Sequence, residues 1–266
     1  MKNYKLTIEY DGTAYFGWEH QPDKPTIQGK IEIVLARMLK GGAQIPGGAQ
    51  MSGGAGEEIR PEDIPEVIGA GRTDAGVHAR GMVANVVMET DLSCDEIRDY
   101  MNRYLPDDIG VLEVREAAER FHARYKASGK TYRYTVCNDV IHPVFNRKYY
   151  AVVDESLDLD AMKRAAEYMT GEHDYKSFCG NTHFKKSTVR EVDSIDIKRS
   201  GSFVYLTFHG NGFLQNMVRI MTGTLLEVGK GRIKAEDIPE IIEAKDRSIA
   251  GPTAPAKGLC LMKVDY

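Results

Sequence analysis

Short runs in which polar and apolar residues alternate recur along this chain, and they constrain its fold more than any other feature. The first run spans residues 4–10, where tyrosine, leucine and isoleucine alternate with lysine, threonine and glutamate. A period of two is typical of a strand that buries one face. Because such runs come in groups, without a helix between each pair, the pattern predicts an α+β fold with an antiparallel sheet. Further strands are expected at 82–88, 130–137, 148–153, 192–199, 203–209 and 258–265.

Helix signals lie between these strands. Thr26 is a favourable N-cap for a helix that ends at the glycines 41–42. Ser93 and Glu96 have the spacing of a capping box, and Pro106 ends the helix that they begin.

The order of elements predicts two halves, 1–106 and 107–266. In the second half, helices are expected over about 159–170 and about 213–228, the latter strongly apolar. Residues 41–70 are first rich in glycine and then acidic, so we expect this segment to lie outside the core.

Composition indicates an ordinary soluble globular protein, because 42% of the 266 residues are hydrophobic and 28% are charged. No apolar run approaches the roughly 20 residues that a membrane span needs, and the first residues do not resemble a signal peptide. A cytoplasmic protein without a membrane partner is therefore expected. The four cysteines and seven histidines lack the close spacing of redox pairs or metal ligands, so no metal is expected.

The formal net charge of −4 argues weakly against a polyanionic partner, but it averages over the whole surface. Residues 120–150 contain seven lysines and arginines against a single acid, Asp139, with tyrosines interleaved. Such a strip suits nucleic acid, because cations meet phosphates and aromatic rings stack on bases. A solvated strand face would show the same pattern, and charge alone does not separate the two.

Three residues call for an explanation beyond packing. Arg219 lies within the apolar helix, so we expect a carboxylate to face it, unless it shares a narrow polar stripe with Gln215 or pairs with a structural acid. Asp74 lies among the small residues of GAGRTDAGVHARG (69–81), where an arginine partner would keep it ionised and make it a nucleophile. A local turn hydrogen bond is the alternative. Tyr132 fits either a core strand position or a base-stacking ring.

Together these segments resemble the tRNA pseudouridine synthase A (TruA) family over nearly the whole chain. The strongest match is GRTDAGVHARGMVANV (71–86). It is accompanied by the segments YDGTAYFGWEHQ (10–21), RFHARYKASGKTYRY (120–134), NGFLQNMVRIMTGTLLEVGKG (211–231) and APAKGLCLMKVDY (254–266).

The resemblance implies two similar ferredoxin-like halves that form one long, mainly antiparallel sheet flanked by helices, with the active-site cleft between the halves. It implies a homodimer that binds tRNA. The implied reaction is an isomerisation, an intramolecular transfer that converts uridine to pseudouridine at positions 38–40 of the anticodon arm, without a cofactor.

The resemblance also implies roles for individual residues. Asp74 matches the nucleophile, Tyr132 the tyrosine that packs on the base and handles a proton, and Arg219 the partner of the aspartate. Arg72 matches a side chain that displaces the target nucleotide, and Leu259 matches the aliphatic residue that lines the base pocket. The residues matched as RNA contacts or as structural hydrogen-bonding groups are His78, Arg80, Arg124 and Lys130.

The chain departs from the family pattern at 41–70, which reads as an insertion, and at Glu19, where glutamine is usual. Two other functions remain as alternatives. A non-catalytic RNA-binding module would keep the basic strip. A phosphotransferase similar to haloacid dehalogenases would use EYDGT (9–13), although Glu9 stands where its nucleophile should be.

Overall fold

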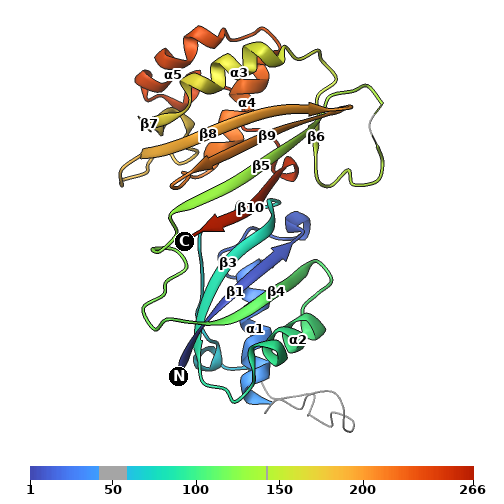
Figure 1. Ribbon diagram of the computed structural model, residues 1–266, viewed down its shortest axis with the longest axis vertical. Helices are drawn as coiled ribbons and strands as arrows, with labels where there is room; N and C mark the ends of the chain where they lie inside the picture. Colours follow the sequence, from blue (N-terminus) through green and yellow to red (C-terminus); the bar gives the residue numbers. More distant parts are fainter. Residues whose placement is uncertain (42–58, 142) are drawn as a thin grey trace. The chain divides into compact units, whose positions relative to one another are not determined.

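The computed structural model describes residues 1–41, 59–141 and 143–266. Two compact units make up the chain, Met1–Ala127 and Ser128–Tyr266. Each combines a mainly antiparallel sheet with helices (Figure 1), so the predicted α+β class is confirmed. The sequence placed the boundary after residue 106. The strand that follows that point pairs with the N-terminal strand, and the first unit therefore extends further along the chain.

The sheet of the first unit has the strand order β4 (Ile109–Ala117), β1 (Lys2–Tyr10), β3 (His78–Met88), and β2 (Val67–Gly69) also pairs with β3. Every one of these pairs is antiparallel. The alternation predicted for residues 4–10 is confirmed, because the apolar members are buried and Glu9 is exposed. Since β1 is antiparallel to both neighbours, the buried parallel strand that the phosphotransferase alternative needs is not present at Glu9.

Helices α1 (Ile27–Lys40) and α2 (Cys94–Tyr104) pack against each other, and they also contact β2 and β4, respectively. Both begin as predicted. The Thr26 side chain accepts from the backbone N–H of Gly29, and Ser93 with Glu96 forms the capping box.

The segment 41–70 is only partly outside the core. Residues 42–58, which hold most of its glycines, lie outside the described residues. Val67 and Ala70 are almost fully buried, and the Val67 N–H donates to Glu32 Oε1 over 3.2 Å. The expectation that the whole segment lies outside the core is therefore wrong for its last residues, because β2 extends the sheet beside β3.

The sheet of the second unit has the strand order β10 (Leu259–Asp265), β5 (Gly129–Cys137), β9 (Phe203–Gly210), β8 (Val189–Ser200), β7 (Gly171–Asp174). It is antiparallel along this path. The strand expected at 148–153 is only β6 (Ala151–Val152), and it pairs with β5 in the parallel sense.

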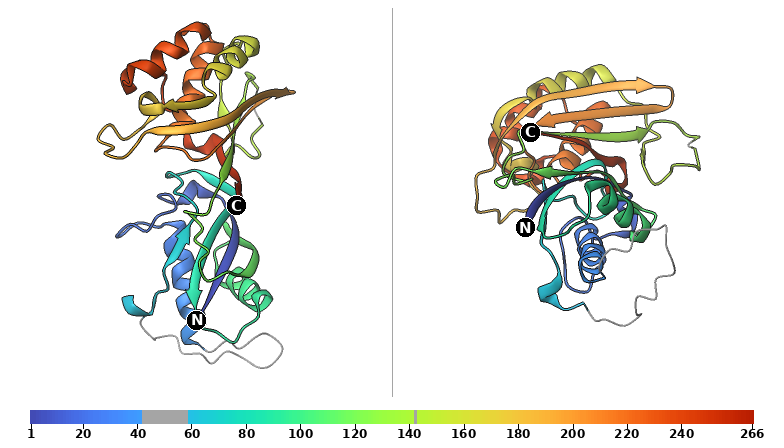
Figure 2. Two further views of the ribbon diagram at one scale, coloured as in Figure 1. Left: turned by 60° about the vertical axis from the view of Figure 1, so that its left-hand side comes forward. Right: turned by 60° about the horizontal axis from the view of Figure 1, so that its bottom comes forward.

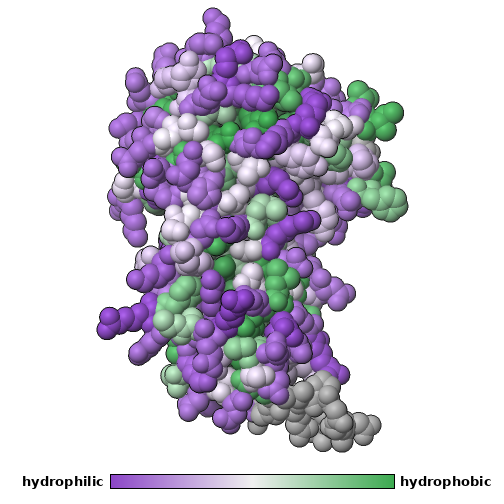
Figure 3. All heavy atoms as spheres, in the orientation of Figure 1, coloured by the Kyte–Doolittle hydropathy of each residue, from purple (hydrophilic) through white to green (hydrophobic). Residues whose placement is uncertain are grey.

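Helices α3 (Leu159–Tyr168), α4 (Met217–Gly229) and α5 (Ile238–Ala244) gather on one face of this sheet (Figures 1 and 2). The helix expected from residue 213 begins only at Met217, because Asn216 has a left-handed backbone with φ of 58°. The face seen in Figure 3 is mostly hydrophilic, with apolar residues exposed in patches. None of the described helices combines the length and apolar character needed to cross a lipid bilayer.

Candidate active site

Asp74 lies in the connection between β2 and β3, and the segment Tyr10–Trp18 holds this connection on both sides. Upstream of Asp74, the Trp18 N–H donates to the Thr73 carbonyl over 3.1 Å. Downstream, the Gly76 N–H donates to the Tyr15 carbonyl over 3.2 Å. The Asp74 carbonyl itself accepts from the N–H of Val77 over 3.1 Å. The backbone around the carboxylate-bearing residue is thus fixed by hydrogen bonds to a segment that is distant in sequence.

Glycines allow the two segments to approach so closely. A Cβ atom on Gly12 would lie 2.0 Å from the Val77 carbonyl oxygen, so no side chain fits there. Gly17 has a φ of +96°, and a Cβ on it would lie 2.5 Å from the Thr73 carbonyl oxygen. These two glycines of the DGTAYFGW segment therefore set the position of the Asp74 loop.

Side chains reinforce the same contact. The hydroxyls of Tyr10 and Thr73 are 2.8 Å apart in a buried hydrogen bond. The Tyr15 hydroxyl donates a hydrogen bond to Asp108 Oδ1 over 2.5 Å. This bond anchors Tyr15, whose carbonyl accepts from the Gly76 N–H. These supporting residues were not identified from the sequence, because Tyr10 reads only as a core position of a strand.

His78, the first residue of β3, is buried with a relative exposure of 4%. Its Nδ1 accepts from the Gly12 N–H over 3.0 Å and lies 3.2 Å from Asp11 Oδ1. The ring therefore ties the start of β3 to the turn after β1. Of the two roles that the resemblance implied for His78, these contacts favour structural hydrogen bonding.

The arginines of the first unit lie at its surface. Arg72 forms an ion pair with Glu19, and 62% and 45% of the two side chains are exposed. Arg80 on β3 and Arg124 are also exposed, and the backbone N–H of Arg124 donates to His122 Nδ1 over 3.2 Å.

Tyr132 and Leu259 lie on neighbouring strands of the second unit. Tyr132 on β5 faces Leu261 on β10, and Tyr134 faces Leu259, so all four side chains lie on one face of the sheet. The rings of Tyr132 and Phe213 pack edge to face, with their centroids 5.4 Å apart. Tyr132 is 7% exposed and Leu259 4%. Both side chains are therefore largely buried on the same face of this sheet.

Tyr134 fixes the turn that precedes Leu259. Its hydroxyl donates to the Pro255 carbonyl over 2.7 Å, and its ring lies where a Cβ on Gly258 would be. Burial raises the pKa of this hydroxyl, so Tyr134 remains a neutral donor.

Arg219 on α4 is half-buried, although most of its helical neighbours are fully buried. Its Nε donates to the Ala254 carbonyl over 2.8 Å, and its Nη1 donates to Asn216 Oδ1 over 2.8 Å. The Ala254 N–H in turn donates to the Arg219 carbonyl over 3.1 Å. The carboxylate partner that the sequence predicts for Arg219 stays a prediction.

Each unit therefore brings together part of the predicted set. In the first unit, Asp74 shares a single connection with Arg72 and leads directly into His78. In the second, Tyr132 and Leu259 share a sheet face. Lys130 lies near the start of β5, in register with Gly210 on β9.

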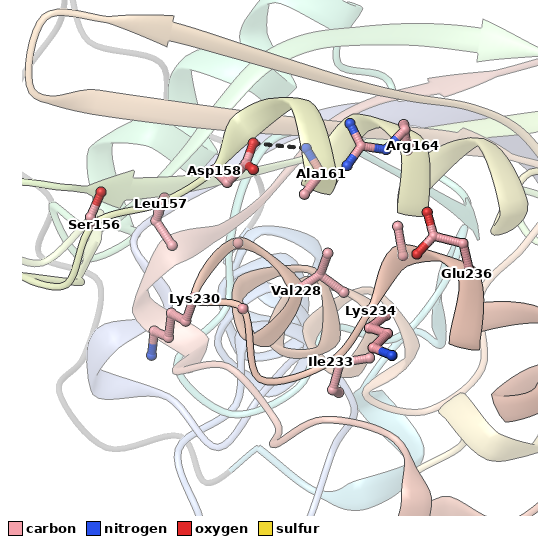
Figure 4. Close-up of a pocket in the computed structure, with 13 residues that line it drawn as sticks. Ser156, Leu157, Asp158, Ala161, Arg164, Val228, Lys230, Ile233, Lys234 and Glu236 are labelled. Atoms are coloured by element: carbon pink, nitrogen blue, oxygen red, sulfur yellow. Dashed lines mark hydrogen bonds between the residues drawn. The ribbon is translucent and has the colours of Figure 1, made fainter.

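A pocket of about 460 Å³ lies elsewhere in the second unit, between the start of α3 and the segment that follows α4 (Figure 4). Its lining includes Arg164 and Lys234 but also the carboxylates of Asp158 and Glu236, so its charge is mixed. The Asp158 carboxylate already accepts from the Ala161 N–H over 2.9 Å. None of the residues predicted for the site lines this pocket. Among residues 1–41, 59–141 and 143–266, no group of three His, Cys, Asp or Glu side chains is arranged to hold a metal ion.

Comparison with known proteins identifies a family and relatives of the same length. The model of the tRNA pseudouridine synthase family matches residues 6–126 and 165–266. A tRNA pseudouridine synthase A from Acetivibrio thermocellus is 42% identical over 266 residues, which cover 100% of both chains. A tRNA pseudouridine synthase A 2 from Bacillus cereus is 42% identical over 267 residues, and a tRNA pseudouridine synthase A from Brevibacillus brevis is 41% identical over 266, again with 100% of both chains covered.

Proposed function

The chain belongs to the tRNA pseudouridine synthase family, and on that premise we propose that it converts uridine to pseudouridine at positions 38–40 of the tRNA anticodon arm. In this proposal Asp74 forms a covalent intermediate with the target nucleotide. A non-catalytic RNA-binding module would share the exposed arginines, but it has no use for an Asp74 whose backbone is fixed on both sides.

The geometry of the Asp74 loop carries the proposal. A nucleophile must be held in place while the space beside its side chain stays open to the substrate. Here the backbone on both sides of Asp74 is hydrogen-bonded, and the next two residues are Ala75 and Gly76. A structural aspartate in a turn would not require the close approach of Gly12 and Gly17 from another segment.

The proposed reaction balances without a co-reactant. The bond between N1 of uracil and C1′ of ribose breaks, the base turns, and a bond forms between C5 and C1′. C5 loses a proton and N1 gains one, so substrate and product have the same composition. The carboxylate of Asp74 is released at the end unchanged.

The other residues take the roles implied by the family. Tyr132 stacks on the base that has left the RNA helix, and such stacking contributes about 1–3 kcal/mol. This offsets part of the few kcal/mol that extruding a paired nucleotide costs. Tyr132 also receives the proton from C5, and Leu259 lines the base pocket beside it. Arg219 pairs with Asp74 and keeps it ionised.

We further infer that the enzyme works as a homodimer in the cytoplasm, as the family resemblance implies. Arg72, Arg80, Arg124 and Lys130 contact the RNA in this proposal. Arg72, Arg80 and Arg124 are exposed, which suits contact with phosphates, and Lys130 is half-buried.

Incubation with unmodified tRNA followed by mass spectrometric mapping tests the proposed function. Pseudouridine is expected at one or more of positions 38–40 and at no other uridine. A tRNA with cytidine at these positions is the control and should remain unmodified. Pseudouridine at other sites would reject the anticodon-arm assignment, and its complete absence would reject the activity.

Glu19 predicts a measurable effect on tRNA affinity. Because its carboxylate pairs with Arg72, an RNA phosphate must displace it to reach the guanidinium. Both side chains are substantially exposed, so the pair contributes little, and we expect Glu19→Gln to lower the Kd for tRNA by about two- to fivefold at low salt. Titration of labelled tRNA at several salt concentrations measures this.

The matched control for Glu19 is the same change in an Arg72→Gln background. If Glu19 acts through Arg72, Glu19→Gln has no further effect there. An equal gain in both backgrounds would instead indicate a general effect of removing one negative charge.

A further inference from the structure

We propose that Asn216 is a positioning residue that fixes the guanidinium of Arg219 for the reaction. This inference rests on the proposed function, because it assumes that Arg219 supports the nucleophile. Three observations support it: the backbone conformation of Asn216, the hydrogen bond of its side chain to Arg219, and the packing around its side-chain amide.

The backbone of Asn216 is in the left-handed region, with φ of 58° and ψ of 5°. A residue with a Cβ atom occupies this region at a cost, although asparagine tolerates it better than most. Glycine would adopt the same conformation freely. The backbone conformation alone therefore does not explain why this position carries an asparagine side chain.

Helix capping is not that reason. Asn216 is the N-cap of α4, a position where asparagine normally accepts a hydrogen bond from the first turn. Among the residues that the structure describes, its side chain accepts no such bond. Its Oδ1 instead accepts from Arg219 Nη1 over 2.8 Å, one turn further along the helix.

The bond from Asn216 complements a second one. Arg219 Nε donates to the Ala254 carbonyl over 2.8 Å. A guanidinium is planar, so two bonds at different nitrogens, to acceptors on two different segments, define both its position and its plane. Loss of Oδ1 of Asn216 removes one of these two fixed points of the guanidinium.

The amide of Asn216 is itself held. The Gly180 N–H donates to the Gln215 carbonyl over 2.8 Å, which brings the turn at Gly180 against the start of α4. A Cβ on Gly180 would lie 2.6 Å from Asn216 Nδ2 and 3.1 Å from its Cβ. This turn packs against the Asn216 side chain and leaves it little freedom to rotate away from Arg219.

The decisive variant is Asn216→Gly, which keeps the left-handed backbone and removes only the side chain. We expect kcat to fall by about 10- to 100-fold, as for other residues that orient a catalytic group, while KM changes less than about twofold. The melting temperature should change by less than about 2 °C, because glycine is unstrained at this φ. Asn216→Ala is the matched structural control and should lower the melting temperature by about 2–4 °C.

Asn216→Asp provides a second test in which the residue still accepts from Arg219. Its negative charge competes for the guanidinium, so Asp74 keeps its proton to higher pH and the acidic limb of the pH–rate profile moves upward. A merely structural role of Asn216 would instead lower the melting temperature of Asn216→Gly without lowering its kcat. In an Arg219→Lys background, Asn216→Gly should cause no additional loss.

Wild-type kcat in Asn216→Gly, together with an unchanged pH–rate profile in Asn216→Asp, would overturn the inference. The proposed function would stand in that case, provided that Asp74→Asn is inactive. An active Asp74→Asn variant would instead reject the proposed function itself, so the two failures are distinct.

Discussion

Asp74→Asn is expected to lower the rate of pseudouridine formation at least about a thousandfold, because an amide of the same shape is not a nucleophile. Binding of tRNA should change less than about twofold, since the loop is held through its backbone. The contacts of Thr73 and Gly76 with the Tyr10–Trp18 segment do not involve the carboxylate. Release of tritium from uridine labelled at C5 follows the reaction, and filter binding follows affinity.

The control for this substitution is Asp91→Asn, which removes the same charge from an exposed residue before α2. It should leave both the rate and the affinity near those of the wild type. Substantial turnover by Asp74→Asn would contradict the nucleophile assignment, whatever the behaviour of the control.

Arg219→Leu is expected to have the second largest effect, a loss of activity of at least about a hundredfold. An arginine beside a carboxylate favours the ionised form. Without the guanidinium the carboxyl of Asp74 keeps its proton to higher pH, so the acidic limb of the pH–rate profile should move to higher pH. The profile of kcat across the acidic and neutral pH range measures this.

Two further variants separate charge from geometry at Arg219. Arg219→Lys keeps the charge but loses the planar fork that bonds Ala254 and Asn216, so we expect an intermediate rate with a smaller shift of the acidic limb. Arg164→Leu removes an exposed arginine of the same unit and should leave the profile unchanged. An acidic limb that stays in place in Arg219→Leu would argue against the pair.

Elements with a local signal could be predicted from the sequence. The alternation in β1 and the capping box of α2 both depend on residues close together in the chain. The strands expected at 192–199 and 203–209 form the hairpin of β8 and β9, in which Ser200 pairs with Phe203 and Gly201 has the positive φ that a tight turn requires.

Other elements could not be predicted because their stability comes from distant partners. The three residues of β2 form a strand only because β3 is beside them, and the two residues of β6 pair with β5 in the parallel sense. Too few residues are present in either for a period to appear. The apolar spacing from residue 213 fits a helix, but spacing does not report the left-handed backbone at Asn216 that delays α4.

The candidate site divides in the same way. Asp74, Tyr132 and Arg219 were identified because their chemistry is unusual for their surroundings and because their motifs resemble a family. The groups that hold them were not identified. Tyr10 touches Thr73, and Asn216 touches Arg219, through contacts that depend on the folded chain rather than on a motif.

The attachment of the Asp74 loop to the Tyr10–Trp18 segment has a dynamic consequence. The amides of Trp18 and Gly76 are each bonded to the opposite segment, so neither segment can open locally while the other keeps its hydrogen bonds. The free energy of local opening of the Tyr10–Trp18 segment therefore limits how far the Asp74 carboxylate can move from its position. Local opening of the Tyr10–Trp18 segment would therefore also displace the carboxylate of Asp74.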